Sequence, residues 1–521
     1  MAKSMQLRKR TGARVRAKIQ SRAPERGSKA SAAKKVRPKK STSKAIAVAE
    51  AAKELNVASA LSRAFTKRVD AVDKKMMLGS DLTRQPRMHT GLLTLDLILG
   101  PGYTPGMTVH FGAEASAKST ATWLGIGQSL KIAMPMRQVY DAEGATDLKY
   151  TSRVIGRDLA ELFGRRSPSG GWEVDPMIRY RDTNITEHVF RGIHRSVSLL
   201  PDKRYSEERK EWFLVFGRSK EETSLLKELG LQPDKRLFSE TGQYWCSVED
   251  DDTPLAIFAV DSLPALVPEA IDEEETSDKA MAINARMLGR VLPLVRGKLR
   301  AKACILLCVN QLRDRPGVTH GVPWYEPMGN VVKFSSDVRC MWTSRVPPPG
   351  WERAENKGLC VESSVEFPGR VDHYAFKAIG NQKNKYGTPF RKGMSRVWIS
   401  DGRGDARGFD PVLDALEALG TLNLIEGPIH DSRRPFRLKI PKIADYSFTY
   451  AAFKTLILAE STRSRHLLDA AQKLGAPKFK IRDHVQKMIA GNHTDLLIAS
   501  GQGKAALANG AVDIESDESE D

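Results

Sequence analysis

Residues 112–120 form a loop of small residues whose types and spacing could hold phosphate groups. Gly112 follows an apolar run, and Lys118 and Ser119 begin a helical pattern. This layout is typical of a P-loop, in which backbone N–H groups and a lysine hold phosphates while a hydroxyl holds Mg²⁺. Ala117 replaces the second glycine of the motif, so the segment alone fits either a nucleotide site or an ordinary strand–turn–helix connection. The candidate phosphate-contacting residues are Gly112, Glu114, Ser116, Ala117, Lys118, Ser119 and Thr120.

Two further strand ends carry the acids that a P-loop needs as partners. Asp261 follows an apolar run and could hold Mg²⁺ through water, although a solvated Asp at a strand end fits equally well. Glu143 follows a second predicted strand and is a candidate general base for an attacking water. Asp147 and Tyr150 come shortly after it. Tyr150 could stack on an adenine, or it could be a half-buried aromatic residue of a helix.

Charge is distributed unevenly along the 521 residues, whose formal net charge is +19. Residues 1–44 hold 16 Lys and Arg against one acid, a net +15, and the last nine residues hold six acids and no base. About +10 remains for the body of the chain. This balance favours a polyanionic partner, nucleic acid first, over two merely solvated tails.

The spacing of the five cysteines and the lengths of the apolar runs indicate the cellular compartment in which the protein is expected. No CxxC pair occurs, and Cys304 and Cys308 lie four apart in an apolar run, so core packing in a reducing cytoplasm is expected. No run of about 18 apolar residues predicts a membrane span. The basic head fits a DNA-binding arm, an organellar address or a nuclear address.

An alternation of strands and helices begins at Gly91 and predicts an α/β fold with a mainly parallel sheet. The predicted strands cover 107–111, 137–141, 177–181, 255–260, 303–309, 337–343, 373–379 and 394–400. Residues 200–252 are rich in charged and aromatic residues, interrupt this alternation, and predict an inserted subdomain.

The remaining segments complete the predicted domain organisation. Residues 1–43 and 501–521 predict disordered basic and acidic tails. Residues 44–85 predict an N-terminal segment, helical over 44–78, and residues 86–408 an α/β core that contains the P-loop candidate. Residues 409–500 predict a small C-terminal domain, with helices at 411–419, 450–473 and 480–490.

Eight segments, in order, resemble the RecA family of strand-exchange recombinases, closest in style to divergent phage members of the UvsX type. The resemblance covers 46–441 apart from the insertion. Its most specific part lies between residues 281 and 334, where the spacings need no gap. The segments are 90–96, 111–120, 141–150, 260–268, 281–287, 309–313, 329–334 and 383–390.

The resemblance implies a RecA-like core with an N-terminal oligomerisation helix and a small C-terminal α/β domain. It implies that Lys118 binds phosphate, that Glu143 activates water, and that Gln311 senses the γ-phosphate. Lys383 and Lys385 would reach the ATP of a neighbouring subunit, where two cations supplied in trans can stabilise the transferring phosphoryl group. The implied cofactors are ATP and Mg²⁺.

Two DNA-binding loops, 269–286 and 312–330, are also implied. The candidate DNA-contacting residues are Met281, Arg286, Arg313, Arg315, Trp324, Tyr325, Gly329 and Asn330. Trp324 and Tyr325 depart from the family's small polar loop, and stacking on bases would contribute about 1–3 kcal/mol per base. Alternatively these two aromatics pack on the insertion or on a neighbouring subunit, and the arginines are solvated charges.

The function implied is an ATP-dependent DNA recombinase. It would form a helical homo-oligomer on single-stranded DNA, pair that strand with a homologous duplex, and work in the cytoplasm of a bacterial host if it is phage-encoded. Ala117 motivates an alternative, a weakly hydrolysing or non-catalytic DNA-binding scaffold. A hexameric helicase is a third hypothesis, which Gln311 and the segment 383–390 disfavour.

Overall fold

The computed structural model describes residues 85–100, 102–249, 252–269, 277–315, 324–355, 358–440 and 444–458. The predicted helix at 44–78, both tails and the helix at 480–490 lie outside these residues. Within them, no helix is both long and apolar enough to cross a membrane.

A ten-stranded sheet organises the described core, in the order β17-β16-β15-β13-β1-β10-β9-β2-β5, with β14 pairing β15. Neighbouring strands from β13 to β5 are parallel, and β14 to β17 add antiparallel pairs. The predicted strands and the mainly parallel α/β fold are therefore confirmed. The bounds are β1 (Gly106–Gly112), β2 (Met136–Asp141), β5 (Arg179–Asp182), β9 (Ala256–Asp261), β10 (Cys304–Gln311), β13 (Val338–Arg345), β14 (Leu359–Ser363), β15 (Val371–Asn384), β16 (Lys392–Ser400) and β17 (Gly408–Phe409).

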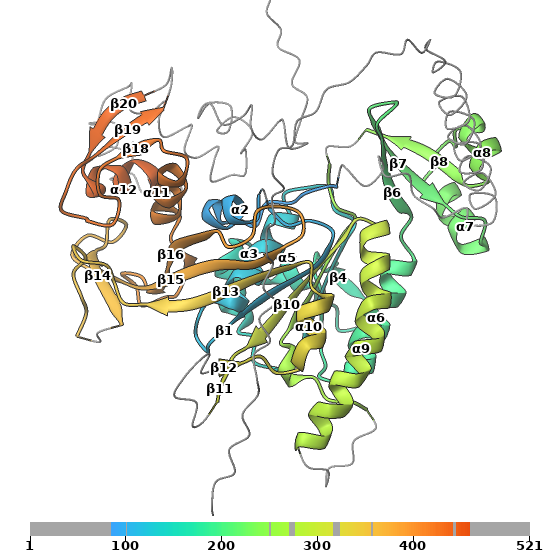
Figure 1. The fold of residues 1–521 in the computed structure, drawn as a ribbon, viewed down its shortest axis with the longest axis horizontal. Coiled ribbons are helices and arrows are strands. Elements are labelled where there is room, and N and C mark those ends of the chain that lie inside the picture. The colour runs from blue at the N-terminus through green and yellow to red at the C-terminus, as the bar shows by residue number, and fades with distance from the viewer. Residues whose placement is uncertain are drawn as a thin grey trace, which may run out of the picture. The chain divides into compact units, whose positions relative to one another are not determined.

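Helices cover both faces of this sheet (Figure 1). On one face, α3 (Lys118–Ser129) packs into a cluster with alternate residues of β9 and β10. On the other, α6 (Thr186–Ser198) and α9 (Ser277–Ala301) pack on the remaining strand residues. Burial on both faces explains why β1 and β9 are continuous buried runs. Shorter elements are α2 (Leu93–Leu99), α4 (Leu148–Ile155), α5 (Leu159–Phe163), η2 (Leu263–Ala265), α10 (Gly329–Ser335), β3 (Arg165–Arg166) and β4 (Trp172–Val174).

The five cysteines are all free and buried. Cys304, Cys308 and Cys340 lie in strands of the central sheet, and burial raises the pKa of the Cys340 thiol to about 12. The prediction that Cys304 and Cys308 serve core packing is confirmed.

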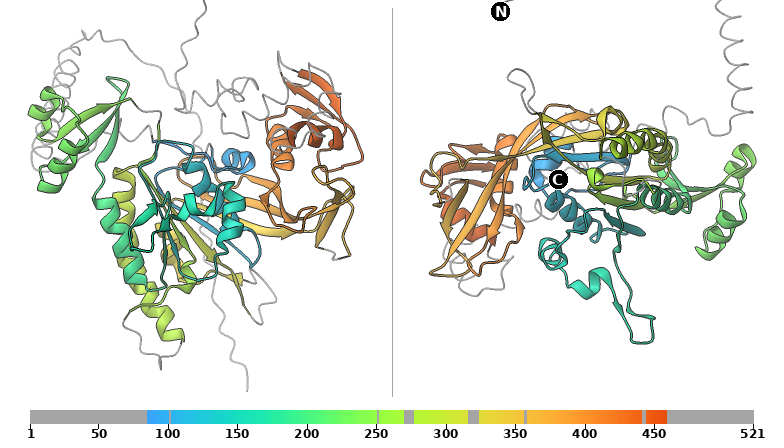
Figure 2. Two further views of the ribbon diagram at one scale, coloured as in Figure 1. Left: turned by 180° about the vertical axis from the view of Figure 1, so that it is seen from behind. Right: turned by 90° about the horizontal axis from the view of Figure 1, so that it is seen from below.

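Residues 202–248 form a three-stranded antiparallel sheet with two helices and a small apolar cluster of their own (Figures 1 and 2). The elements are β6 (Asp202–Ser206), β7 (Glu211–Phe216), α7 (Lys220–Glu228), α8 (Lys235–Thr241) and β8 (Tyr244–Val248). Lys302, the residue after α9, pairs with Asp202 at the start of β6, with 3.4 Å between Nζ and Oδ1.

Among the described residues after β17, which end at residue 458, the chain forms two helices and a small sheet, and one apolar cluster joins them to β14–β16. The helix predicted at 411–419 is present, and the helix predicted at 450–473 is described as far as residue 458. The resemblance implied an α/β domain here, but the positions of the three short strands were not predicted. The elements are α11 (Pro411–Thr421), β18 (Ile425–Glu426), β19 (Phe436–Ile440), β20 (Ala444–Phe448) and α12 (Tyr450–Leu458).

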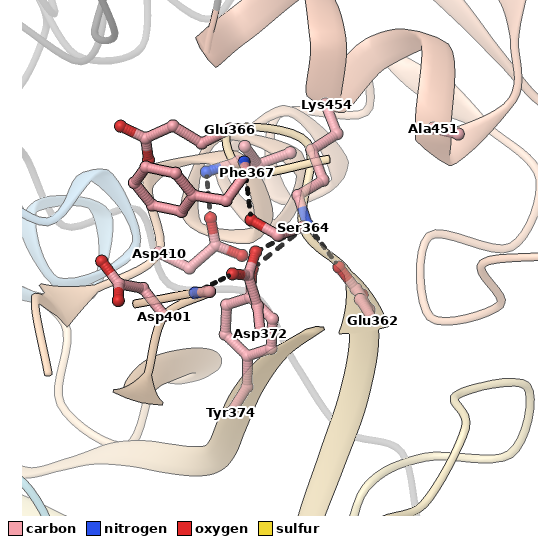
Figure 3. Close-up of polar contacts among 12 residues, drawn as sticks. Glu362, Ser364, Glu366, Phe367, Asp372, Tyr374, Asp401, Asp410, Ala451 and Lys454 are labelled. Atoms are coloured by element: carbon pink, nitrogen blue, oxygen red, sulfur yellow. Dashed lines mark hydrogen bonds and ion pairs between the residues drawn. The ribbon is translucent and has the colours of Figure 1, made fainter. Parts of the chain in front are cut away.

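A buried network of charges also holds α12 to the strands (Figure 3). Lys454 of α12 lies 2.7 Å from Glu362 and 3.6 Å from Asp372, and it donates to the Tyr374 hydroxyl at 3.1 Å. The fully buried Arg396 pairs with Glu362 and Asp410. Every charged member therefore has an oppositely charged partner within the protein.

Candidate nucleotide site and nucleic-acid loops

Four adjacent inner strands, β1, β10, β9 and β2, have their carboxyl ends on the same side of the sheet. Gly112, Glu143, Asp261 and Gln311 lie at or just after those ends. Gly112 at the end of β1 is in register with Gln311 at the end of β10. Asp261 at the end of β9 is in register with Asp141 at the end of β2. Crevices at the carboxyl ends of parallel strands are where open α/β sheets bind ligands.

The P-loop backbone has the conformation that glycine prefers, although alanines occupy it. Ala115 and Ala117 have φ of 53° and 74°, in the left-handed region. Such a conformation costs a non-glycine residue about 1 kcal/mol or more. Gly112 is required for a different reason, because a Cβ there would lie 2.1 Å from the Trp342 carbonyl oxygen.

The loop ends at α3, whose N-terminus has no side-chain cap. Its free N–H groups and the helix dipole favour an anion there. Lys118 is only 6% exposed, and its Nζ donates to the Ala113 carbonyl at 2.5 Å and to Ser116 Oγ at 3.2 Å. Burial lowers the pKa of Lys118 to about 8, although Asp261, Glu143 and Glu114 oppose that shift.

Asp261 and Ser119 lie beside this lysine and form the oxygen pair expected of a magnesium site. A hydrogen bond from Ser119 reaches the Asp261 carboxylate. Burial, with Glu143 and Asp141 nearby, raises the pKa of Asp261 to about 6 against the opposing effects of Ser119 and Lys118.

Glu143 is presented by a turn that Asp141 holds together. The buried Asp141 carboxylate accepts hydrogen bonds from the N–H groups of Glu143, Gly144 and Thr146. Glu143 Oε1 then accepts from Gln311 Nε2 at 2.7 Å and from the Ser262 hydroxyl at 2.5 Å. The predicted base and the predicted phosphate sensor are thus in direct contact.

Asp147 and Tyr150 lie at the start of α4, next to the P-loop helix. The Asp147 carboxylate accepts from the N–H groups of Lys149 and Tyr150, so it caps α4. The Tyr150 hydroxyl lies 2.9 Å from Thr120 Oγ1. Tyr150 is half-buried and packs against the apolar cluster that includes residues of α3.

Lys383 and Lys385 lie at the opposite edge of the sheet from the P-loop. Strand β15 runs antiparallel to β13, and Asn384 is in register with Val338 at the amino end of β13. Lys383 Nζ donates to the Lys333 carbonyl at 2.6 Å, and Lys385 Nζ lies 3.4 Å from Asp337 Oδ1. Within one chain these lysines therefore do not join the nucleotide site.

Within the second predicted DNA loop, 312–330, β11 (Arg313–Asp314) pairs with β12 (Trp324–Tyr325). The Trp324 ring centroid lies 6.5 Å from that of Phe111 of β1, so Trp324 packs against the apolar cluster of the central sheet. Arg313 and Arg315 are exposed, and Arg315 lies 5.8 Å from the Tyr325 ring.

The buried Glu326 anchors the far end of this loop. It pairs with Arg339 of β13, whose guanidinium lies 4.5 Å over the Phe111 ring, and it lies 3.7 Å from Lys333. A contact path therefore runs from the loop to β1, which ends in the P-loop. Ser262 and Glu326 lie in segments that the sequence singled out, 260–268 and 312–330, but neither was named as a site residue. Their roles depend on contacts with the distant residues Glu143 and Arg339.

The remaining predicted DNA contacts lie at the starts of two helices. Residues 277–286, treated in the sequence as part of a loop, belong to α9, where Arg286 is exposed. The side chain of Met281 lies outside the described residues. Gly329 and the exposed Asn330 begin α10.

Comparison with known proteins gives the family described as the RecA N-terminal domain, which matches residues 232–345. That stretch includes Asp261 and Gln311 but not the P-loop or Glu143. Protein RecA of Chloroherpeton thalassium is 28% identical over 294 residues, 56% of this chain and 61% of the relative. Protein RecA of a Synechococcus species is 26% identical over 341 residues, 65% of each chain. Protein RecA of a Synechocystis species is 26% identical over 257 residues, 49% of this chain and 52% of the relative. The chain thus matches about half to two thirds of the length of these relatives.

Proposed function

Because the chain belongs to the RecA family, we propose that it is an ATP-dependent DNA recombinase that assembles on single-stranded DNA and pairs that strand with a homologous duplex. The observation that supports this most strongly is the contact between Glu143 and Gln311 at the edge that carries the P-loop. It joins the proposed water-activating base to the strand that leads directly into the proposed DNA loop.

In the proposed reaction, the loop N–H groups and Lys118 hold the phosphates of ATP. Glu143 accepts the proton of the attacking water, and Gln311 holds the Glu143 carboxylate in position through the 2.7 Å hydrogen bond. Once γ-phosphate occupies the site, Gln311 has a competing acceptor. If the Gln311 side-chain amide released Glu143 and bound phosphate instead, the change would move the β11–β12 hairpin, which starts two residues later.

The donor set at the site fits Mg²⁺. The Ser119 hydroxyl and the Asp261 carboxylate would supply adjacent oxygen ligands, the type that this ion prefers. Ser119 would bind Mg²⁺ directly and Asp261 through water, and the ion would neutralise charge on the β- and γ-phosphates.

We propose that self-assembly uses the edge that carries Lys383 and Lys385. Phe334, at the end of α10, is 75% exposed, and its carbonyl accepts from Lys383. An exposed aromatic residue beside two lysines suits a subunit interface, with the lysines reaching phosphate in trans.

Electron microscopy of the full chain with single-stranded DNA tests this function. Helical filaments that require ATP, together with strand exchange between the coated strand and a homologous duplex, are expected. Phe334→Ala should shorten the filaments, whereas Leu229→Ala, at an exposed apolar position on the insertion, should not. Closed rings with unwinding activity would favour a helicase.

A scaffold that barely hydrolyses ATP is the second candidate, and the φ of 74° at Ala117 is the observation that favours it. Steady-state turnover of the parent, Ala117→Gly and Glu143→Gln distinguishes the two. Equal background rates in all three proteins, with filaments still forming on DNA, would establish the scaffold.

A further inference from the structure

Strand β15 carries a second lysine, Lys377, next to the P-loop. Lys377 and Lys383 lie towards opposite ends of this strand. Lys377 is in register with Ser344, near the carboxyl end of β13. Its Nζ donates to the Ala115 carbonyl at 2.7 Å and to Ser344 Oγ at 3.0 Å. Six residues of extended strand, about 20 Å, separate it from Lys383.

Lys377 is buried without an anionic partner. It is 5% exposed, and both of its hydrogen-bond acceptors are neutral oxygens. Among the residues that the structure describes, no carboxylate forms an ion pair with it. Burying an ammonium without a counter-charge is costly, so proteins retain such groups where an anion arrives. Burial lowers the pKa of Lys377, and Lys377 in turn contributes to the lowered pKa of Lys118.

The bond to Ala115 determines the orientation of a P-loop peptide group. A trans peptide is planar, so its C=O and N–H point in opposite directions. When Lys377 holds the Ala115 carbonyl, the N–H of Ser116 points to the other side of that peptide. Ala115 has a φ of 53°, a conformation that alanine rarely adopts without such an external constraint.

We propose that Lys377 is a second lysine of the nucleotide site, supplied by the same chain, which positions the P-loop and adds the positive charge that the phosphates of a bound nucleotide neutralise. This inference rests on the proposed function, because it needs a nucleotide at the loop. The site then receives Lys377 in cis from one end of β15, while Lys383 at the other end serves the neighbouring subunit.

Isothermal titration of ADP into the full chain tests this proposal, with thermal unfolding of the ligand-free protein alongside. Lys377→Met should weaken ADP binding on the order of tenfold or more, because a charge-assisted hydrogen bond is lost. Its ligand-free melting temperature should equal or exceed that of the parent, since an unpaired buried charge is removed. Lys377→Arg should restore most of the affinity. Lys220→Met, on the exposed surface of the insertion, is the matched control and should change neither quantity.

Ser344→Asp provides an independent variant at an exposed position. It gives the Lys377 ammonium a carboxylate partner and should also weaken ADP binding. The proposal is overturned if folded Lys377→Met binds ADP within twofold of the parent, or if Lys377→Arg is as weak as Lys377→Met. If Lys377→Met does not fold, unchanged ADP binding by Ser344→Asp overturns it. A parent protein that binds no ADP would overturn the proposed function and this inference together.

Discussion

Two buried lysines, in different regions of the molecule, have opposite surroundings. Lys454 of α12 is 2% exposed and lies within ion-pair distance of Glu362 and Asp372. Lys377 at the P-loop is buried almost as deeply, yet contacts only neutral oxygens. We infer that the Lys454 ammonium, which carboxylates of the same chain neutralise, contributes to the stability of the fold. The Lys377 ammonium has no such partner and lies beside the P-loop, where the phosphates of a bound nucleotide would neutralise it.

The largest effect is expected at Glu143, on the nucleotide side of this comparison. Glu143→Gln should lower the rate of ATP hydrolysis about 10²-fold or more, because general base catalysis typically contributes that much. Nucleotide affinity should change little, since Lys118 and the loop N–H groups remain. Single-turnover hydrolysis with a parallel binding titration measures both. A proportionate loss of affinity would mean that Glu143 holds the nucleotide and does not activate water.

Removing the charge of Lys454, in the ion-paired region, should lower the free energy of unfolding without changing the affinity for ADP. Lys454→Met should destabilise the fold by about 3 kcal/mol, because it leaves Glu362 and Asp372 buried with one cation fewer. Denaturant unfolding measures this change, and ADP titration of the folded fraction should match the parent. The matched variant Lys118→Met should lower the affinity for ADP and leave the free energy of unfolding nearly unchanged. If Lys454→Met left stability unchanged, the contrast between the two regions would be wrong.

A pH dependence should come from Glu417 of α11. Burial, and secondarily Asp414, raises the pKa of Glu417 to about 8 in the folded protein, above its usual 4.5, and His430 lies 3.3 Å from its carboxylate. The folded state therefore takes up a proton before the unfolded chain does. Stability should rise as the pH falls through 8 towards 4.5, and should be lost as the pH rises through 8.

Glu417→Gln should remove most of that dependence and raise stability at pH 8.5 by about 2 kcal/mol. Thermal melts of both proteins at pH 6.5 and pH 8.5 check the sign. Asp414, whose pKa is raised to about 6, acts in the same direction but over a lower pH range. A parent that is more stable at pH 8.5 than at pH 6.5 would refute the assignment to Glu417.

The smallest effect is expected at Ala117. Ala117→Gly should stabilise the ligand-free protein by about 1 kcal/mol at most, because relief at φ of 74° is partly offset by the greater freedom of glycine in the unfolded chain. Turnover of ATP should rise as the loop relaxes. A melting temperature below that of the parent would show that the methyl group contributes packing that outweighs the strain.

The edge of the sheet that carries Gly112, Glu143, Asp261 and Gln311 could be predicted from the sequence. Gly112 and Asp261 directly follow apolar runs, and Glu143 comes shortly after a third. Gln311 was placed by the family resemblance, and parallel strands bring their carboxyl ends together. Lys377 could not be predicted, because its place depends on the antiparallel pairing of β13 with β15, which no local pattern encodes.

Trp324 and Tyr325, in the second predicted DNA loop, also show what the sequence could not predict. Their stacking potential is evident from residue type, but the packing of Trp324 on Phe111 depends on how the hairpin folds back onto the core. The capping role of Asp147 is local and follows a known N-cap pattern, but it competes with a nucleotide role that the motif also allows. The sheet formed by β18–β20 has strands too short for a clear alternation.

The most direct test is the steady-state rate of ATP hydrolysis by the full chain with and without single-stranded DNA. The path from Gln311 through the β11–β12 hairpin predicts that DNA stimulates hydrolysis, and that Gln311→Ala abolishes the stimulation while ADP still binds. A rate that does not change with DNA in the parent, under conditions where DNA is bound, would contradict the coupling of this nucleotide site to DNA.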